Sequence, residues 1–179
     1  MTQAIIHSSF QQLPQALLDA RAAFDCGEPA LNRYLQHTAG QHDSKHIART
    51  FCGERDGVLF GYYSLSNAEV DVGVLPVEIL KRYRLPAHRL PVVRLARLAV
   101  DVRFQGQGLG AHLLIAALSQ VLQVAERSGC VGMVVDAKEG KADFYLAYGF
   151  RQAPDNPGCL FMPLPDIQAL FALSPNHPG

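Results

Sequence analysis

The chain has 179 residues, 49% of them hydrophobic and 18% charged, so it can bury a sizeable core and is not expected to be disordered. Sixteen basic and sixteen acidic residues cancel, which argues against a uniformly basic nucleic-acid-coating protein but leaves room for a local basic patch. No two of the four cysteines form a CxxC pair, no stretch approaches 18 apolar residues, and MTQAIIHSSF lacks the pattern of a signal peptide. We therefore predict a single domain over residues 1–179, located in the cytoplasm.

The front of the chain predicts a helix followed by a β-hairpin. Residues 28–38 (EPALNRYLQHT) carry apolar side chains at helical spacing, with a proline early in the segment. A polar segment, 39–46 (AGQHDSKH), separates this helix from two predicted strands at 47–52 and 58–65. The Asp56-Gly57 pair between the strands is typical of a tight hairpin turn.

The two histidines of the polar segment, His42 and His46, have the i, i+4 spacing of metal ligands on a helix. The sequence offers no obvious third ligand. We therefore interpret 39–46 as a solvated polar segment and expect no metal site.

The back of the chain predicts a crossover unit after an irregular, proline-containing stretch at 74–92. The predicted elements are a strand at 91–102, a helix at about 109–128, a strand at 130–137, a helix at 142–148 ending at Gly149, a strand at 158–162 and a helix at 166–173. Strands and helices in this order indicate a mixed α/β (α+β) fold.

Three glycines, Gly106, Gly108 and Gly110, lie where the strand at 91–102 gives way to the long helix. Backbone N–H groups at a glycine-rich turn and a helix N-terminus together bind anions such as phosphate. Gln105 and Arg103 precede the glycines and offer a side-chain donor and a positive charge. The pattern thus indicates a phosphate-binding loop, with a flexible turn as the alternative.

A dinucleotide-binding fingerprint also fits the glycine pattern, but its surroundings fit poorly. The acidic residue that should follow by about 20 residues is represented by Asp136, which is further away. The strand before the loop carries Arg94 and Arg97, unusual for the buried first strand of a parallel sheet. The remaining chain is also too short for a second nucleotide-binding half.

Two motifs resemble the GNAT superfamily, the N-acyltransferases that use acetyl-CoA. The first is Q-x-x-G-x-G from Gln105 to Gly110, and the second is ADFYLAYGF from Ala142 to Phe150. Within this superfamily the chain is similar, over nearly its whole length, to the acetyltransferase toxins of toxin–antitoxin modules. That similarity rests on FDCGEPALNRYL, GYYSLS, LPVVRLARLAVD and FMPLPDIQALF.

The resemblance implies a GNAT fold, with antiparallel front strands, a splayed fourth and fifth strand, and helices on both faces of the sheet. It implies that acetyl-CoA is bound by the fourth strand and the loop after it, through Leu98, Ala99, Val100, Arg103, Gln105, Gly106, Gln107, Gly108, Leu109 and Gly110. Tyr145 matches the tyrosine that serves as general acid for the departing thiolate. On the predicted helix Phe144 and Tyr148 are four residues apart and share a ridge, so we expect them to pack. Tyr145 is turned about 100° from Phe144, so it is free to face a cleft. The alternative is that all three aromatic residues only pack the helix.

The chain is neutral as a whole, but arginines cluster between residues 82 and 97. The resemblance implies aminoacyl-tRNA as the acceptor, with its phosphates bound by Arg82, Arg84, Arg89, Arg94 and Arg97. It implies a small antitoxin partner and a homodimer, with no membrane contact. An α-amino group titrates near pH 8, so no strong general base is required. The alternatives are a GNAT acetyltransferase for a protein N-terminus, a polyamine or another small amine, and a non-catalytic CoA-binding module.

Overall fold

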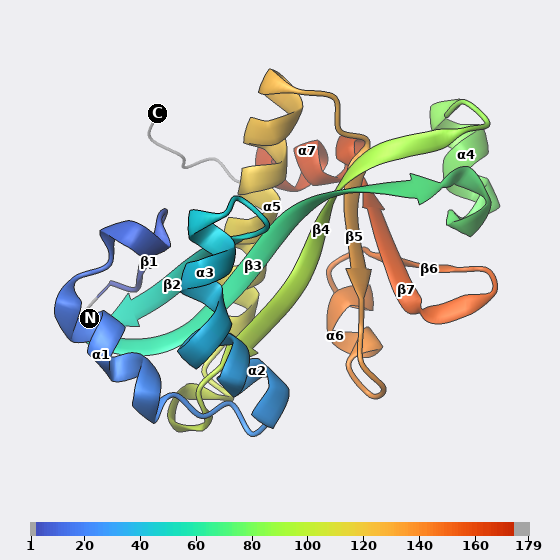
Figure 1. Cartoon of the computed structure of the whole chain (residues 1–179). Helices are drawn as coiled ribbons and strands as arrows, with labels where there is room; N and C mark the ends of the chain where they lie inside the picture. Colours follow the sequence, from blue (N-terminus) through green and yellow to red (C-terminus); the bar gives the residue numbers. More distant parts are fainter. Residues whose placement is uncertain (1–2, 174–179) are drawn as a thin grey trace. The chain divides into compact units, whose positions relative to one another are not determined.

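A computed structural model describes residues 3–173 of the chain. Within this range seven strands form one sheet in the order β1-β2-β3-β4-β5-β7-β6 (Figure 1). The strands are β1 (Ile5–His7), β2 (Arg49–Arg55), β3 (Val58–Asp71), β4 (Arg89–Val100), β5 (Gly132–Asp136), β6 (Arg151–Ala153) and β7 (Asn156–Pro163). This mixed sheet with its helices confirms the predicted fold class.

The α-helices are α1 (Gln15–Ala20), α2 (Pro29–Arg33), α3 (Ala39–Ser44), α4 (Val77–Tyr83), α5 (Leu109–Arg127), α6 (Ala142–Leu146) and α7 (Leu164–Ala172). Short 3-10 turns lie at Phe10–Gln12, Arg21–Ala23, Val72–Val74 and Val102–Phe104, and one π-helical turn lies at Tyr34–Thr38. The four cysteines are free.

The described residues divide into two compact units. The first combines residues up to Ser66 with Leu95–Ala117, and the second combines Asn67–Arg94 with residues from Leu118 onward. The boundaries between the units fall inside β3, β4 and α5, so each of these elements has one part in the first unit and one part in the second. That residues 1–179 form a single domain stays a prediction.

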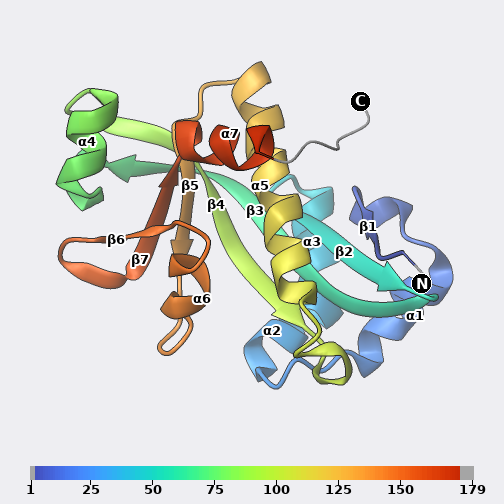
Figure 2. The ribbon, with the colours of Figure 1, turned by 180° about the vertical axis from the view of Figure 1, so that it is seen from behind.

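In the first unit helices cover both faces of the sheet. The N-terminal helices bury one face, in a cluster that includes Phe24, Tyr34, Leu35 and Tyr62. The N-terminal half of α5 lies on the opposite face (Figure 2). A Cβ at Gly61 of β3 would lie 2.9 Å from a Leu113 methyl of α5 and 2.6 Å from the Ala99 carbonyl oxygen of the neighbouring strand β4. The start of α5 is therefore held against the ends of β3 and β4.

In the second unit, the core lies between the outer parts of β3 and β4, the β5–β7 pair and helix α4. Its buried side chains are Val70, Leu75, Ile79, Leu90, Val92, Val134 and Phe161. Strand β7 pairs antiparallel with both β5 and β6, and α7 packs against β5 and β7.

The predicted hairpin is present between β2 and β3. Asp56 and Gly57 both have positive φ, at 55° and 74°, and Arg55 pairs with Val58 across the turn. Two positive φ angles are the requirement of the tight hairpin turn that an Asp-Gly pair predicts.

Two segments differ from the prediction. Residues 39–46 are not a solvated polar segment, because most of them form α3, which buries Ala39 and Asp43. The irregular stretch at 74–92 contains α4, which follows Pro76 and buries Ile79. A helix of only one or two turns shows too few apolar positions for a helical spacing to be recognised, so α3 and α4 were not predicted as helices.

Helix α5 is long and apolar enough, by length and composition alone, to cross a membrane. Its residues Leu113, Leu114, Ala117, Leu118 and Val121 are fully buried in the protein. The apolar face of α5 that carries these residues therefore packs inside the fold.

Candidate active site

The glycine loop connects the 3-10 turn at Val102–Phe104 to α5. Gly106 and Gly108 adopt φ angles of 75° and 77°, and a Cβ at either position would meet no atom within 4 Å. The first hydrogen bond of α5 runs from His112 N–H to the Gly108 carbonyl, at 3.2 Å. The N–H groups of Leu109 and Gly110 precede this bond, so they have no acceptor inside the helix. Open glycines beside free helix amides fit a phosphate group.

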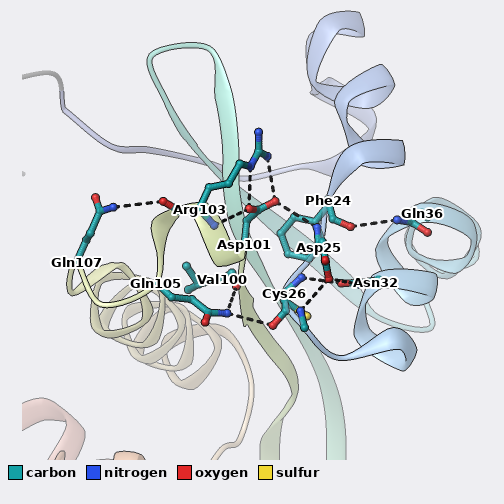
Figure 3. Close-up of polar contacts among 11 residues, drawn as sticks. Phe24, Asp25, Cys26, Asn32, Gln36, Val100, Asp101, Arg103, Gln105 and Gln107 are labelled. Atoms are coloured by element: carbon teal, nitrogen blue, oxygen red, sulfur yellow. Dashed lines mark hydrogen bonds and ion pairs between the residues drawn. The ribbon is translucent and has the colours of Figure 1, made fainter.

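A buried carboxylate, Asp101, anchors the start of this loop (Figure 3). Its Oδ1 accepts hydrogen bonds from the Arg103 backbone N–H at 3.0 Å and from Arg103 Nε at 2.8 Å. Its Oδ2 accepts from an Arg103 terminal nitrogen at 3.0 Å and from the Asp25 backbone N–H at 3.2 Å. Three donors from Arg103 and one from Asp25, far away in the sequence, thus bind the Asp101 carboxylate.

These contacts determine the ionisation of the pair. Burial acts to raise the pKa of Asp101, but the hydrogen bonds from Arg103 and the Asp25 N–H outweigh it and leave that pKa below its usual value. The hydrogen bond and charge of Asp101 in turn raise the pKa of Arg103. Both groups stay charged at neutral pH, and the Arg103 charge is balanced by a fixed carboxylate.

The segment FDCGEPALN folds back on itself to meet the loop. Asp25 Oδ1 accepts from Gly27 N–H at 2.9 Å and from Asn32 Nδ2 at 2.8 Å, and Asn32 Oδ1 accepts from Cys26 N–H at 2.9 Å. The hydrogen bonds from Gly27 and Asn32 lower the pKa of Asp25. The Asp25 carbonyl also accepts from Val102 N–H at 2.8 Å, so residues 25–32 form a brace along the loop.

The side chain of Gln105 belongs to this brace rather than to a ligand site. Its Nε2 donates to the Val100 carbonyl at 2.8 Å and to the Cys26 carbonyl at 3.0 Å (Figure 3). An amide nitrogen carries two hydrogens, so both donors are engaged. The expectation that this side chain offers a free donor to phosphate is therefore not met, and the backbone of Gln105 is what remains for that role.

Arg97, on the part of β4 that lies in the first unit, stacks on an aromatic ring. Its guanidinium carbon lies 3.6 Å from the centroid of Tyr34, the first residue of the π-helical turn. Tyr34 stacks in turn on Tyr62, and its hydroxyl lies 3.3 Å from Thr50 Oγ1. This cation–π contact holds the half-buried arginine against an aromatic ring and does not involve a carboxylate.

In the second unit, Arg82, Arg84, Arg89 and Arg94 occur on α4, just after it, and on β4. Arg94 pairs with Asp136 at the end of β5, and Arg89 Nε lies 3.1 Å from a Glu69 carboxylate oxygen. Arg82 lies over the ring of Tyr83, and Arg84 ends α4 with a left-handed φ of 50°. Two of the four arginines expected to contact tRNA in this unit therefore already have an acidic neighbour.

Tyr145 is the buried residue of α6, with 8% of its surface exposed. Its ring packs edge-on against Phe144 and Phe150, at centroid distances of 5.0 and 5.6 Å. Phe144 also contacts Tyr148, as expected of a packing pair. Burial raises the pKa of Tyr145 to about 12, so its phenol stays protonated throughout the physiological range.

Comparison with known proteins decides the family. A family model described as the acetyltransferase (GNAT) domain matches residues 47–152. The chain belongs to the GNAT acetyltransferases. The match includes the Asp101 anchor, the glycine loop and Tyr145, and it confirms the predicted fold and the acetyl-transfer activity.

This acetyltransferase is similar over most of its length to bacterial toxins. A "tRNA-acetylating toxin" of Mycobacterium tuberculosis is 34% identical over 88% of this chain and 95% of its own. A solved mutant of KacT has a TM-score of 0.85 and 32% identity, with 94% of this chain and 99% of that one covered. AtaT complexed with acetyl-methionyl-tRNAfMet has a TM-score of 0.82 and 30% identity, with 94% and 99% covered.

A further AtaT structure bears on cofactor and partner. It shows a tyrosine-to-phenylalanine mutant toxin bound to acetyl-CoA and to the C-terminus of the antitoxin AtaR. Its TM-score is 0.75 at 30% identity, with 94% of this chain and 98% of that one covered. The KacT structure is also a tyrosine-to-phenylalanine mutant.

Sequence reasoning on this acetyltransferase found the loop but not the residues that hold it. Asp101, Asp25 and Asn32 were not nominated, although each lies inside a stretch that carried the family resemblance. The short polar cluster Asp-Cys-Gly before a predicted helix could have drawn attention to Asp25. It gives no indication that the Asp25 N–H binds Asp101, 76 positions away.

Proposed function

We propose that this protein transfers the acetyl group of acetyl-CoA to the α-amino group of an aminoacyl-tRNA, and that it is a translation-blocking toxin of a toxin–antitoxin module. The observation that carries this proposal is its similarity, over nearly the full length of both chains, to a toxin that acetylates tRNA. The AtaT complex with an acetylated aminoacyl-tRNA supports the same acceptor.

The first unit supplies the residues that fit acetyl-CoA. The amides of Gly106–Gly110 are proposed to bind the pyrophosphate, because there is open space beside Gly106 and Gly108 and the helix dipole favours an anion at the N-terminus of α5. The backbone of Leu98, Ala99 and Val100, at the end of β4, is proposed to hold the pantetheine arm. One of these amides would polarise the thioester carbonyl, and backbone donors of this kind stabilise the developing oxyanion.

Tyr145 is proposed as the group that assists departure of the thiolate. A phenol with a pKa of about 12 is always present as a donor at neutral pH, so it can hydrogen-bond the sulfur as negative charge develops. The amine loses one proton and the thiolate gains one, so the phenol is unchanged after each turnover. A tyrosine was also the residue replaced in the KacT and AtaT structures, which supports this choice.

The α-amine of an aminoacyl ester needs little help to become a nucleophile. Its pKa lies near 8, so a substantial fraction is neutral at physiological pH without a strong general base. A lysine side chain, with a pKa near 10.4, would be almost wholly protonated under the same conditions. The chemistry therefore favours an α-amino acceptor.

Arg97, with Arg82, Arg84, Arg89 and Arg94, is proposed to contact the phosphates of the tRNA acceptor end. Such contacts give affinity without reading sequence. We propose a cytoplasmic location, because the proposed substrate is charged tRNA, and we propose a small antitoxin and a second copy of the chain as partners. Light scattering of the purified protein would test the homodimer.

The decisive experiment is incubation of the protein with acetyl-CoA and a pool of charged tRNA, followed by mass spectrometry of the released aminoacyl ends. We expect acetylated amino acids to appear with the protein and to be absent without acetyl-CoA. If charged tRNA gains no acetyl group while a protein N-terminus or a polyamine does, the acceptor proposed here is wrong.

The variant Tyr145→Phe tests the proposed general acid. It keeps the buried ring and removes only the hydroxyl, so we expect folding to be preserved and kcat to fall about 100-fold or more. Expression of the wild-type chain should arrest growth, and the variant should relieve that arrest. Full acetyl transfer by Tyr145→Phe would exclude Tyr145 from the chemistry.

A further inference from the structure

The hairpin between β2 and β3 brings an arginine to the glycine loop. Arg55 is the last residue of β2, and its terminal nitrogen donates to Gln107 Oε1 at 2.6 Å. Gln107 lies between the two open glycines, 52 residues further along the chain. Its Nε2 approaches the Arg103 carbonyl at 3.4 Å, so Gln107 links Arg55 to the backbone that leads into the loop.

Arg55 and Arg103 both contact the ring of Phe104, which ends the 3-10 turn before the loop. The guanidinium carbon of Arg55 lies 5.3 Å from the ring centroid, and that of Arg103 lies 5.7 Å from it. Phe104 in turn contacts Phe60 of β3. The ring therefore contacts one cation from its own turn, Arg103, and one from the β2–β3 hairpin, Arg55.

The two arginines differ in what balances their charge. Arg103 donates two side-chain hydrogen bonds to the buried carboxylate of Asp101, so a fixed negative charge offsets its positive charge. Arg55 donates to the neutral amide of Gln107. A guanidinium has five N–H donors, and this bond uses one of them. Arg103 also keeps unused N–H donors, but of the two arginines Arg55 is the one whose charge is not offset by a carboxylate in these contacts.

We propose that Arg55 binds a phosphate group of acetyl-CoA, a role that sequence analysis had assigned to Arg103. The inference deepens the proposed function, since it rests on acetyl-CoA being the cosubstrate held at this loop. Arginine forms strong charge-assisted hydrogen bonds with phosphate, and the neighbouring helix N-terminus favours an anion at the same place.

Calorimetric titration with two ligands, acetyl-CoA and acetyl-3′-dephospho-CoA, tests the proposal on the purified full chain. The variants are Arg55→Gln, which removes the charge, and Gln107→Ala, which removes its link to the loop but keeps the cation. Arg127→Gln is the matched control. It removes one exposed arginine at the other end of α5, about 27 Å away along the helix, and leaves the loop intact.

We expect Arg55→Gln to weaken acetyl-CoA binding about 10-fold or more, Gln107→Ala to weaken it less, and Arg127→Gln to leave it unchanged. If the loss disappears with the dephospho ligand, Arg55 binds the 3′-phosphate. If the loss is the same for both ligands and exceeds that of Gln107→Ala, Arg55 binds the pyrophosphate.

Two results would overturn the proposal. Unchanged binding by Arg55→Gln excludes a phosphate contact, and equal losses in Arg55→Gln and Gln107→Ala for both ligands show that Arg55 only positions the loop. Failure of the wild-type chain to bind acetyl-CoA would instead remove the proposed function. The wild-type titration therefore distinguishes failure of the inference from failure of the function.

Discussion

Two aspartate–arginine pairs, one in each compact unit, show how differently the same residue types can serve a protein. Asp101 is 1% exposed at its side chain and accepts four hydrogen bonds, two of them from backbone N–H groups. Asp136 is 60% exposed and pairs with Arg94 on the neighbouring strand. The first pair is part of the framework of the loop, whereas the second lies where solvent and a ligand phosphate can compete for the arginine.

The largest effect that should separate the pairs is on stability. Asp101→Ala leaves the Asp25 and Arg103 N–H groups without their acceptor, and we expect it to lower the free energy of unfolding by about 2 to 4 kcal/mol. Asp136→Ala should lower it by less than about 1 kcal/mol, because its carboxylate is solvated. Urea titrations of both variants measure the difference. Equal losses would mean that burial does not distinguish the pairs.

A second difference should appear in acid. The pKa of Asp101 is lowered by folding, so its stabilising contribution is present above the unfolded-state pKa near 3.9 and is lost as pH falls through the lower folded pKa. The stability advantage of the wild type over Asp101→Ala should therefore be constant from pH 7 to about 5 and shrink below about pH 4. Urea titrations over this range measure it. An advantage that grows on acidification would contradict the sign.

The smallest effect concerns the exposed pair and the acceptor. If Arg94 contacts tRNA, Asp136 competes with phosphate for it, and Asp136→Asn should tighten aminoacyl-tRNA binding about two- to fivefold at low salt. Arg94→Gln should weaken binding and reduce its salt dependence. Filter binding across a salt series compares the two variants. Weaker binding by Asp136→Asn would show that the carboxylate supports tRNA binding instead of opposing it.

Sequence alone was sufficient for the parts of this fold whose signals are local. The hairpin at Asp56-Gly57, the glycine loop, α5 and α6 were all predicted close to where they lie, because turn chemistry and helical periodicity operate over a few residues. The loop and Tyr145 also lie within the region that matches the family.

The supports of the site were missed because they depend on contacts between distant residues. Nothing near Asp101 in the sequence indicates that the Asp25 N–H will bind it. Nothing near Arg55 indicates Gln107 either. Only the structure shows that Arg103 faces a carboxylate and Arg55 an amide, and the role proposed for Arg55 rests on that difference.

The first unit is built from two separate stretches of the chain, and this has a consequence for folding during synthesis on the ribosome. Its two parts are separated by residues 67–94, which belong to the other unit. At ~5–20 residues per second, the front strands wait for seconds before β4 and α5 emerge to complete their core. During this interval the Asp25 amide and the face of β3 that will contact Leu113 have no native partner. A newly made chain therefore cannot assemble its cofactor loop until about two thirds of it has been translated.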